Sequence, residues 1–176
     1  WIISLIFGTL FGVISSDIFN EFIDLPNFVK RSINTFLNVI RSFHELIWCL
    51  ILMQIFGISK SIGIFSICIP FSAINAKVIK EQLALISPKT IQSITNISGK
   101  NIASFITIIW SQIKKTIKNF GIYRFECCLR STAILGLFGI GGIGTNIFLS
   151  YQSLNFREMW TYLWSLALLT IISRPL

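Results

Sequence analysis

Runs of apolar residues separated by short polar stretches make up most of the first half of the chain. The runs cover residues 1–14, about 35–56 and about 62–76. Since a helix that crosses a membrane needs about 20 mostly apolar residues, the pattern predicts membrane-spanning helices, the first of them truncated at its start. A short turn at residues 57–63 joins the second run to the third, so we expect an antiparallel helical hairpin, kinked at Pro70.

Further apolar runs follow in the second half of the chain. Residues 102–113 are apolar, but three lysines follow closely, so this stretch is expected at the membrane interface or just before a span. Residues 123–149 form a long segment that is charged in its first half and rich in glycine in its second, and residues 156–172 form the last run. Together the runs predict an all-α, polytopic transmembrane bundle of about five spans.

The region from Lys77 to Lys118 is the most basic part of the chain, with seven lysines against a single acid, Glu81. Cytoplasmic loops of membrane proteins carry an excess of lysine and arginine. We therefore expect this region in the cytoplasm. The turn near Lys60 and the polar residues 152–158 are then expected on the outside of the membrane.

A short helix is predicted inside this basic region. Ser87-Pro88 is typical of a helix N-cap followed by proline at the first helical position. Ile91, Ile94 and Ile97 then repeat at helical spacing, which gives the helix one apolar face. Such a helix outside the bilayer core either lies on lipid or binds a cytoplasmic partner, and the periodicity alone leaves both possibilities open.

Composition supports the membrane assignment. Of the 176 residues, 53% are hydrophobic and only 12% are charged, whereas soluble domains have about 45–50% and about 25%. This excludes a soluble enzyme, a disordered tail and a nucleic-acid-binding arm. The net charge of +8 indicates cytoplasmic loops that face anionic lipid or a partner protein, and no nucleic acid. The four cysteines are expected to be membrane-buried thiols: Cys49, Cys68, Cys127 and Cys128.

Two short patterns match catalytic or cofactor motifs by spacing alone. Gly139-x-Gly141-x-x-Gly144 has the dinucleotide-binding spacing, but that motif requires a preceding strand, and its surroundings here are apolar membrane helix. Glycines in such a place allow tight turns and close helix packing. His44-Glu45 matches the start of a zinc-peptidase motif, but the chain has no second histidine. We therefore expect no catalytic residue, cofactor or metal, and the absence of paired aspartates argues against an intramembrane enzyme.

Arg124, Glu126 and Arg130 are charged residues at the start of a predicted span. A charge inside a membrane costs about 2.5–3.5 kcal/mol on insertion scales, so these side chains should pair or face a wet cavity. Glu126 and Arg130 are four residues apart, so one helical face can pair them. Two interpretations remain: an internal ion pair that helps packing, or the polar lining of a translocation path that suits an anionic solute.

Three stretches of the chain carry longer motifs. Residues 40–51 contain Arg-Ser-Phe-His-Glu-Leu-Ile-Trp-Cys-Leu, residues 123–136 read Tyr-Arg-Phe-Glu-Cys-Cys-Leu-Arg-Ser-Thr-Ala-Ile-Leu-Gly, and residues 139–144 read Gly-Ile-Gly-Gly-Ile-Gly. In order and spacing, over nearly the whole chain, they resemble the permease of phosphonate ABC importers. That subfamily has Arg-Ser-x-Pro-Glu-Leu-x-Trp-Ala-Leu, with His44 here in place of proline. It also has Tyr-Arg-Phe-Glu-x-Asn-x-Arg, with Cys128 in place of asparagine, and Gly-Ala-Gly-Gly-Ile-Gly.

The resemblance implies the MetI-like permease fold. Residues 1–176 would form a single, N-terminally truncated transmembrane domain with a cytoplasmic coupling loop at residues 77–101. In this family a loop with a Glu-Ala-Ala motif docks on the ATPase, and residues 87–99 occupy its place. The implied docking residues are Ser87, Pro88, Ile91, Gln92, Ser93, Ile94, Ile97, Ser98 and Gly99. The implied path residues are Arg124, Glu126, Arg130, Gly139, Gly141, Gly142 and Gly144.

The resemblance also implies a function and partners. The chain would be a multi-pass subunit in the bacterial inner membrane that moves phosphonate or a related phosphorus oxyanion inward, without chemistry of its own. A cytoplasmic ATP-binding subunit, an extracytoplasmic substrate-binding protein, a second permease chain in a homodimer and membrane lipid would be its partners. The alternatives are a permease for methionine or another small polar solute, and a membrane scaffold that transports nothing.

Overall fold

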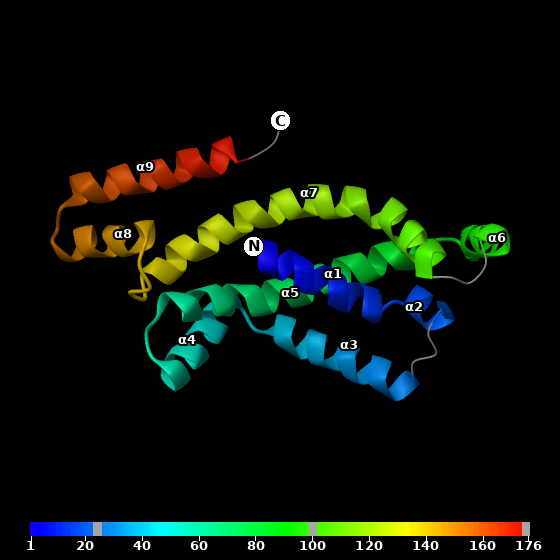
Figure 1. Ribbon diagram of the computed structural model, residues 1–176. Coiled ribbons are helices and arrows are strands. Elements are labelled where there is room, and N and C mark those ends of the chain that lie inside the picture. Colours follow the sequence, from blue (N-terminus) through cyan, green and yellow to red (C-terminus); the bar gives the residue numbers. More distant parts are fainter. Residues whose placement is uncertain (23–25, 99–101, 174–176) are drawn as a thin grey trace. The chain divides into compact units, whose positions relative to one another are not determined.

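The computed structural model describes residues 1–22, 26–98 and 102–173, and every regular element in these ranges is an α-helix (Figure 1). The expected all-α fold is thus confirmed for the described residues. The helices are α1 (Ile2–Ile14), α2 (Asp17–Phe22), α3 (Asn27–Ser42), α4 (Glu45–Phe56), α5 (Lys60–Ala84), α6 (Pro88–Ser98), α7 (Ile102–Gly136), α8 (Ile143–Gln152) and α9 (Phe156–Ile172).

The chain forms two compact units. The first unit contains residue 1 with residues 43–70 and 122–176, and the second contains residues 2–42 and 71–121. Helices α5 and α7 each contribute residues to both units. Each unit is therefore described by itself below.

Helix α5 has 25 residues and is long and apolar enough to cross a membrane. A second span within the described ranges is obtained only if α3 and α4 are counted together as one broken helix. The expectation of one continuous helix over residues 35–56 is wrong, because His44 adopts an extended backbone (φ −66°, ψ 149°) and starts a new helix there. Its ring Nδ1 accepts a hydrogen bond from the backbone N–H of Leu46 at 3.4 Å. The number of five spans stays a prediction.

The basic region is more helical than expected. Lys77, Lys80 and Glu81 lie in the last turns of α5, which continues to Ala84, and Lys114 lies inside the 35-residue α7. The expected polar loop from residue 77 is therefore wrong in its first part: residues 77–84 are helix, and residues 85–87 join α5 to α6. The physical reason is that lysine and glutamate favour helices almost as strongly as leucine does.

An apolar cluster forms the core of the second unit, with members from α2, α5, α6 and α7. Its buried residues are Ile18, Ile79, Leu83, Ile91, Ile109 and Ile113. Full burial of an isoleucine side chain contributes about 1.5–3 kcal/mol. The cluster therefore fixes α6 to the ends of α5 and α7 that lie in this unit.

Helix α1 lies very close to α5 in the second unit. Ser4, Gly8 and Gly12 are buried at intervals of four residues. A Cβ atom at Gly12 would lie 2.7 Å from the carbonyl oxygen of Ala76, and one at Gly8 would contact Asn75 at an even shorter distance. Small residues on one face of a helix allow such backbone approach. The Asn75 Nδ2 also donates to the Ser4 carbonyl oxygen at 3.2 Å.

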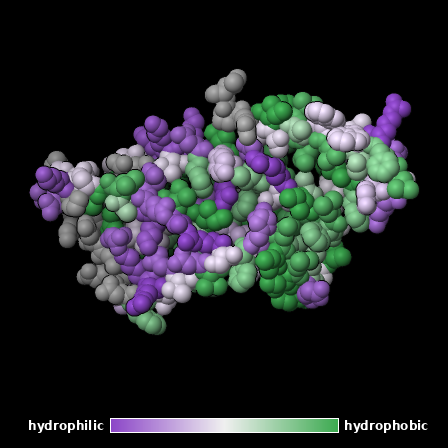
Figure 2. Space-filling model, turned by 180° about the vertical axis from the view of Figure 1, so that it is seen from behind, coloured by the Kyte–Doolittle hydropathy of each residue, from purple (hydrophilic) through white to green (hydrophobic). Residues whose placement is uncertain are grey.

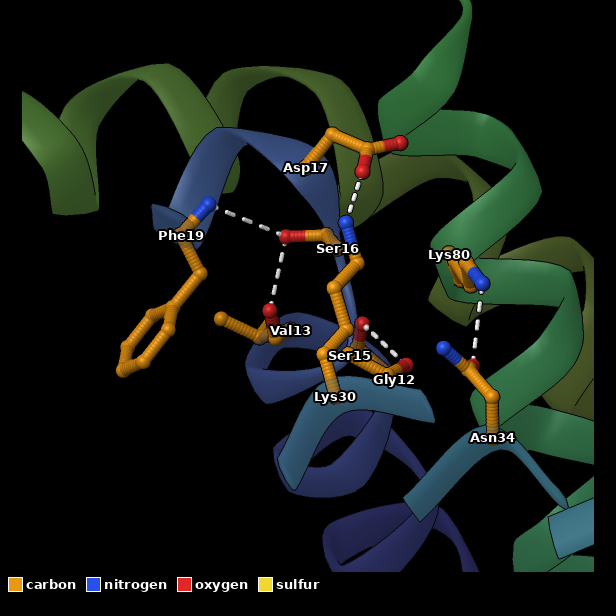
Figure 3. A network of polar contacts seen from close by, with 9 residues as sticks. All are labelled: Gly12, Val13, Ser15, Ser16, Asp17, Phe19, Lys30, Asn34 and Lys80. Carbon is orange, nitrogen blue, oxygen red and sulfur yellow. Dashed lines mark hydrogen bonds and ion pairs between the residues drawn. The ribbon is translucent and has the colours of Figure 1, made fainter. Parts of the chain in front are cut away.

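Polar contacts fix the corner between α1 and α2 (Figure 3). The Ser16 hydroxyl donates to the Val13 carbonyl oxygen at 2.7 Å and accepts from the backbone N–H of Phe19 at 3.3 Å. Asp17 forms an ion pair with Lys30, which joins α2 to α3. These contacts stabilise the connection between α1 and α2, and the ion pair ties α2 to the start of α3.

Helices α8 and α9 pack against each other in the first unit, joined by residues 153–155 (Figure 1). Many large apolar side chains stay exposed in this unit, among them Phe56 of α4 and Trp160 and Trp164 of α9. Figure 2 shows broad hydrophobic areas on the face that it presents. Soluble monomers rarely expose such patches, and these surfaces suit contact with lipid or a partner protein.

Candidate functional site

The second half of α7 carries the three charged residues that the sequence singled out. Glu126 is buried, and its Oε1 accepts a hydrogen bond from Nη2 of Arg130 at 2.5 Å. This confirms the predicted pairing one helical turn apart. Arg124 is half-buried on the preceding turn. The structure thus places a paired acid and base on α7, while their part in a translocation path remains a prediction.

A hydrogen bond joins α4 to α7 next to this pair. The Ser131 hydroxyl donates to Oε1 of Glu45 at 2.7 Å, across 86 positions of the sequence. Ser131 is buried, and Glu45 stands in the first turn of α4, with its other oxygen 3.5 Å from Nε2 of His44. Sequence reasoning missed this contact. The available signal was an acid, Glu45, inside an apolar run.

A glycine-rich turn follows α7. The φ angles of Gly139, Gly141 and Gly142 are +81°, +106° and +92°, values that other residues adopt only with strain. The Thr145 hydroxyl donates to the Gly136 carbonyl oxygen at 2.8 Å and accepts from the Gly141 N–H at 3.0 Å, which closes the turn. Because the segment follows a helix and not a strand, it is not a dinucleotide-binding motif.

Helix α8 returns against the end of α7. A Cβ atom on Gly136 would lie 2.7 Å from the Cα of Gly144, and one on Gly144 would overlap the carbonyl of Ala133. The expected role of these glycines in tight turns and close packing is confirmed. The predicted long segment over residues 123–149 is therefore two helices with a turn between them.

A cavity of about 140 Å³ lies beside the glycine turn in the first unit. Its walls come from α7, α9 and the turn, and Thr132 is the one hydroxyl-bearing residue among otherwise apolar ones. Gly141 and Gly142 line this cavity, while Arg124, Glu126 and Arg130 do not. Of the predicted path residues, this cavity therefore brings together Gly141 and Gly142.

Helix α6 begins where the sequence predicts. The Ser87 hydroxyl accepts from the backbone N–H of Thr90 at 3.3 Å, which confirms the N-cap. The expectation that Ile91 lies on a docking face is wrong: Ile91 is 6% exposed and belongs to the core cluster of the second unit. Ile91 of α6 is thus packed against the chain itself. Among the side chains of α6 that the structure describes, those of Lys89, Thr90, Gln92, Ser93 and Asn96 are exposed.

The other docking residues are not described to the same extent. Gly99 lies outside the described residues, as does Lys100. The side chains of Pro88, Ile94, Ile97 and Ser98 also lie outside the described part of the chain.

The four cysteines are all free thiols. Cys49 is buried, while Cys68, Cys127 and Cys128 are half-buried.

Helix α5 has the length and hydropathy that a membrane-crossing helix needs. No protein-family model matches the chain. It is 25% identical over 118 residues to the "Phosphate-import permease protein PhnE" of Mycolicibacterium smegmatis, a match that covers 67% of this chain and 22% of the relative. It is 22% identical over 87 residues to the "Putative cryptic phosphonate transport system permease protein PhnE2" of Escherichia coli, covering 49% of this chain and 71% of the relative. No solved structure matches.

Both relatives are named as PhnE-type permeases. At 22–25% identity, they support an assignment at the level of that family and nothing finer. Permeases transport solutes and are not enzymes, and these are the proteins to which the chain is similar. The chain spans about a fifth of the length of the M. smegmatis relative.

Proposed function

We propose that the chain is a transmembrane subunit of an ABC importer that moves phosphonate or a related phosphorus oxyanion into the cell. The observation that carries the proposal is the hydrogen bond from Ser131 to Glu45. It joins two of the three stretches that resemble phosphonate permeases, and the third, the glycine turn, directly follows α7. The names of both relatives point to the same class of solute.

The charges on α7 supply a reason for an anionic solute. Arg124, Glu126 and Arg130 together carry a net charge of +1. Because Glu126 is paired with Arg130, the local field of Arg124 is only partly cancelled by the acid. A moderate positive potential concentrates anions without holding them tightly. We propose that these residues, with Gly139, Gly141, Gly142 and Gly144, border the path.

The remaining parts of the proposal concern topology and partners. The chain would cross a bacterial inner membrane several times, with the basic region around α6 in the cytoplasm. The ATP-binding subunit would dock on the exposed face of α6, through Lys89, Gln92 and Ser93. A substrate-binding protein would deliver the solute from outside, and a second copy of the chain would complete the path.

Uptake measured in cells tests the proposal. The chain is expressed with its own ATP-binding subunit and binding protein in a bacterial strain that lacks phosphonate uptake, and entry of radiolabelled methylphosphonate and of methionine is measured. We expect energy-dependent methylphosphonate uptake. Uptake of methionine without methylphosphonate would show that the chain is a permease for a different solute. If neither compound enters the cell and the ATP-binding subunit no longer copurifies, the importer proposal is refuted in favour of a scaffold.

A matched pair of variants tests the path. Arg124→Gln should slow methylphosphonate uptake about tenfold per folded transporter, because a nearby cation raises the local anion concentration. Arg157→Gln is the control, since Arg157 is an exposed arginine of the same unit, in the first turn of α9. An equal effect of both substitutions would show that Arg124 has no special place near the solute.

A further inference from the structure

The second unit contains a polar cavity that no part of the proposed function uses. Its volume is about 300 Å³, and it lies between the end of α1, the polar face of α3 and the last turns of α5. Its charged and amide-bearing walls are Asn34, Asn38, Arg41, Lys77, Lys80 and Glu81. All of these residues belong to one compact unit.

The cavity has an excess of positive charge and of hydrogen-bond donors. Three cations face one acid, and Glu81 is engaged at 3.3 Å by Nζ of Lys77. Nζ of Lys80 donates to Oδ1 of Asn34 at 2.9 Å, which directs the Asn34 amide oxygen to the lysine and leaves its NH₂ group as a donor (Figure 3). Arg41 adds a guanidinium with a planar fork of donors. The net charge of +2 and the donor-rich wall fit a tetrahedral oxyanion.

Helix α3 gives the cavity polar side chains, while several of its large apolar side chains are exposed. Asn34, Asn38 and Arg41 line the cavity together with the buried Leu37, whereas Phe28 is 80% exposed and Phe36 is 64% exposed. In water such exposure of apolar side chains is unfavourable. Contact of Phe28 and Phe36 with lipid would remove this cost and leave the polar side chains of α3 for the cavity.

We infer that this cavity binds a phosphoryl or phosphonyl group, carried either by a free phosphorus oxyanion or by the headgroup of an anionic phospholipid. Lys80, held by Asn34, supplies a fixed charge, and Arg41 supplies paired donors to two oxygens of the group. The site stands on its own residues and depends neither on docking at α6 nor on the charges of α7.

Direct binding to the purified full chain tests this site. In lipid-free neutral detergent, radiolabelled methylphosphonate and inorganic phosphate are the probes, measured by equilibrium dialysis. In nanodiscs of phosphatidylglycerol or phosphatidylcholine, the probe is the lipid retained after transfer to detergent, measured by native mass spectrometry. Arg41→Gln is compared with Arg31→Gln, an exposed arginine on the same helix that does not line the cavity.

We expect Arg41→Gln to weaken anion binding about tenfold, and Arg31→Gln to change it less than about twofold, because only Arg41 can contact the bound group. If binding of the free anions depends on Arg41, the cavity is a solute site. If retention of phosphatidylglycerol depends on Arg41, the cavity is a lipid site. Equal behaviour of the two variants in both arms would overturn the inference. Lys80→Gln is the second variant if Arg41→Gln does not fold, and its control is Lys118→Gln, at an exposed lysine of the same unit that does not line the cavity.

Discussion

Removal of either partner of the Glu126–Arg130 pair is expected to have unequal effects on stability. The Glu126 side chain is only 9% exposed, whereas the Arg130 side chain is 56% exposed. In Arg130→Gln, the buried carboxylate loses its charged donor, and leaving a buried charged group without its partner costs about 3–5 kcal/mol. Because water can reach one side of this pair, we expect a smaller loss than that, about 2–3 kcal/mol.

Substitution of the acidic partner is predicted to lower stability only slightly. In Glu126→Gln the buried group becomes neutral, and the guanidinium of Arg130 can turn to solvent, so the loss should stay below about 1 kcal/mol. The double variant should recover most of the loss of Arg130→Gln, since no buried charge is then left unpaired. Arg130→Lys is the charge-preserving control and should lie between the two single variants.

Thermal unfolding in detergent, followed by the circular dichroism of the helices, measures this series. From the highest to the lowest melting temperature, we expect wild type, Glu126→Gln, Arg130→Lys and Arg130→Gln. The double variant should melt near Glu126→Gln. If Glu126→Gln were as damaging as Arg130→Gln, the acid would not be the buried member of the pair. The reasoning from side-chain exposure would then be refuted.

Three further predictions use other parts of the structure. Gly12→Leu should prevent folding or cost more than about 3 kcal/mol by overpacking α1 against α5, whereas Ile6→Leu on the exposed face of α1 should be neutral; the yield of monodisperse protein measures both. Ile91→Asp should destabilise the chain by about 3 kcal/mol or more, while Lys89→Glu should leave the melting temperature unchanged and lower ATPase copurification. Gly141→Ala should cost about 1–3 kcal/mol because of its positive φ, and unchanged thermal stability would contradict the described turn.

Local sequence signals predicted much of the helical fold. Apolar runs indicated helices α4, α5 and α9, and the Ser87-Pro88 pair marked the start of α6. The glycines at 139–144 correctly indicated a tight turn, since glycine adopts a positive φ angle at little steric cost, and Gly139, Gly141 and Gly142 do so here. Glu126 and Arg130 could be paired from their spacing, because four residues make one helical turn.

Other features depend on contacts that no local pattern contains. The break at His44 was missed because apolar residues continue on both sides of it, and the N-cap role of its ring is visible only in the structure. The polar residues Lys77 and Lys80 indicate a loop by pattern alone, but α5 continues through them to Ala84, because a polar side chain indicates exposure and not the end of a helix. The Ser131–Glu45 hydrogen bond joins positions 86 residues apart, which spacing arguments cannot reach.

The burial of Ile91 changes what docking at α6 would do. An exposed Ile91 would be a contact that a partner covers, but here this side chain belongs to the core with Ile79, Leu83 and Ile113. Packed cores resist deformation, so a displacement of α6 would be passed to the parts of α5 and α7 that share the cluster. In the proposed importer, the ATP-binding subunit would therefore contact polar residues such as Gln92 on the outer side. The inner side would transmit the movement toward the segments that continue into the first unit.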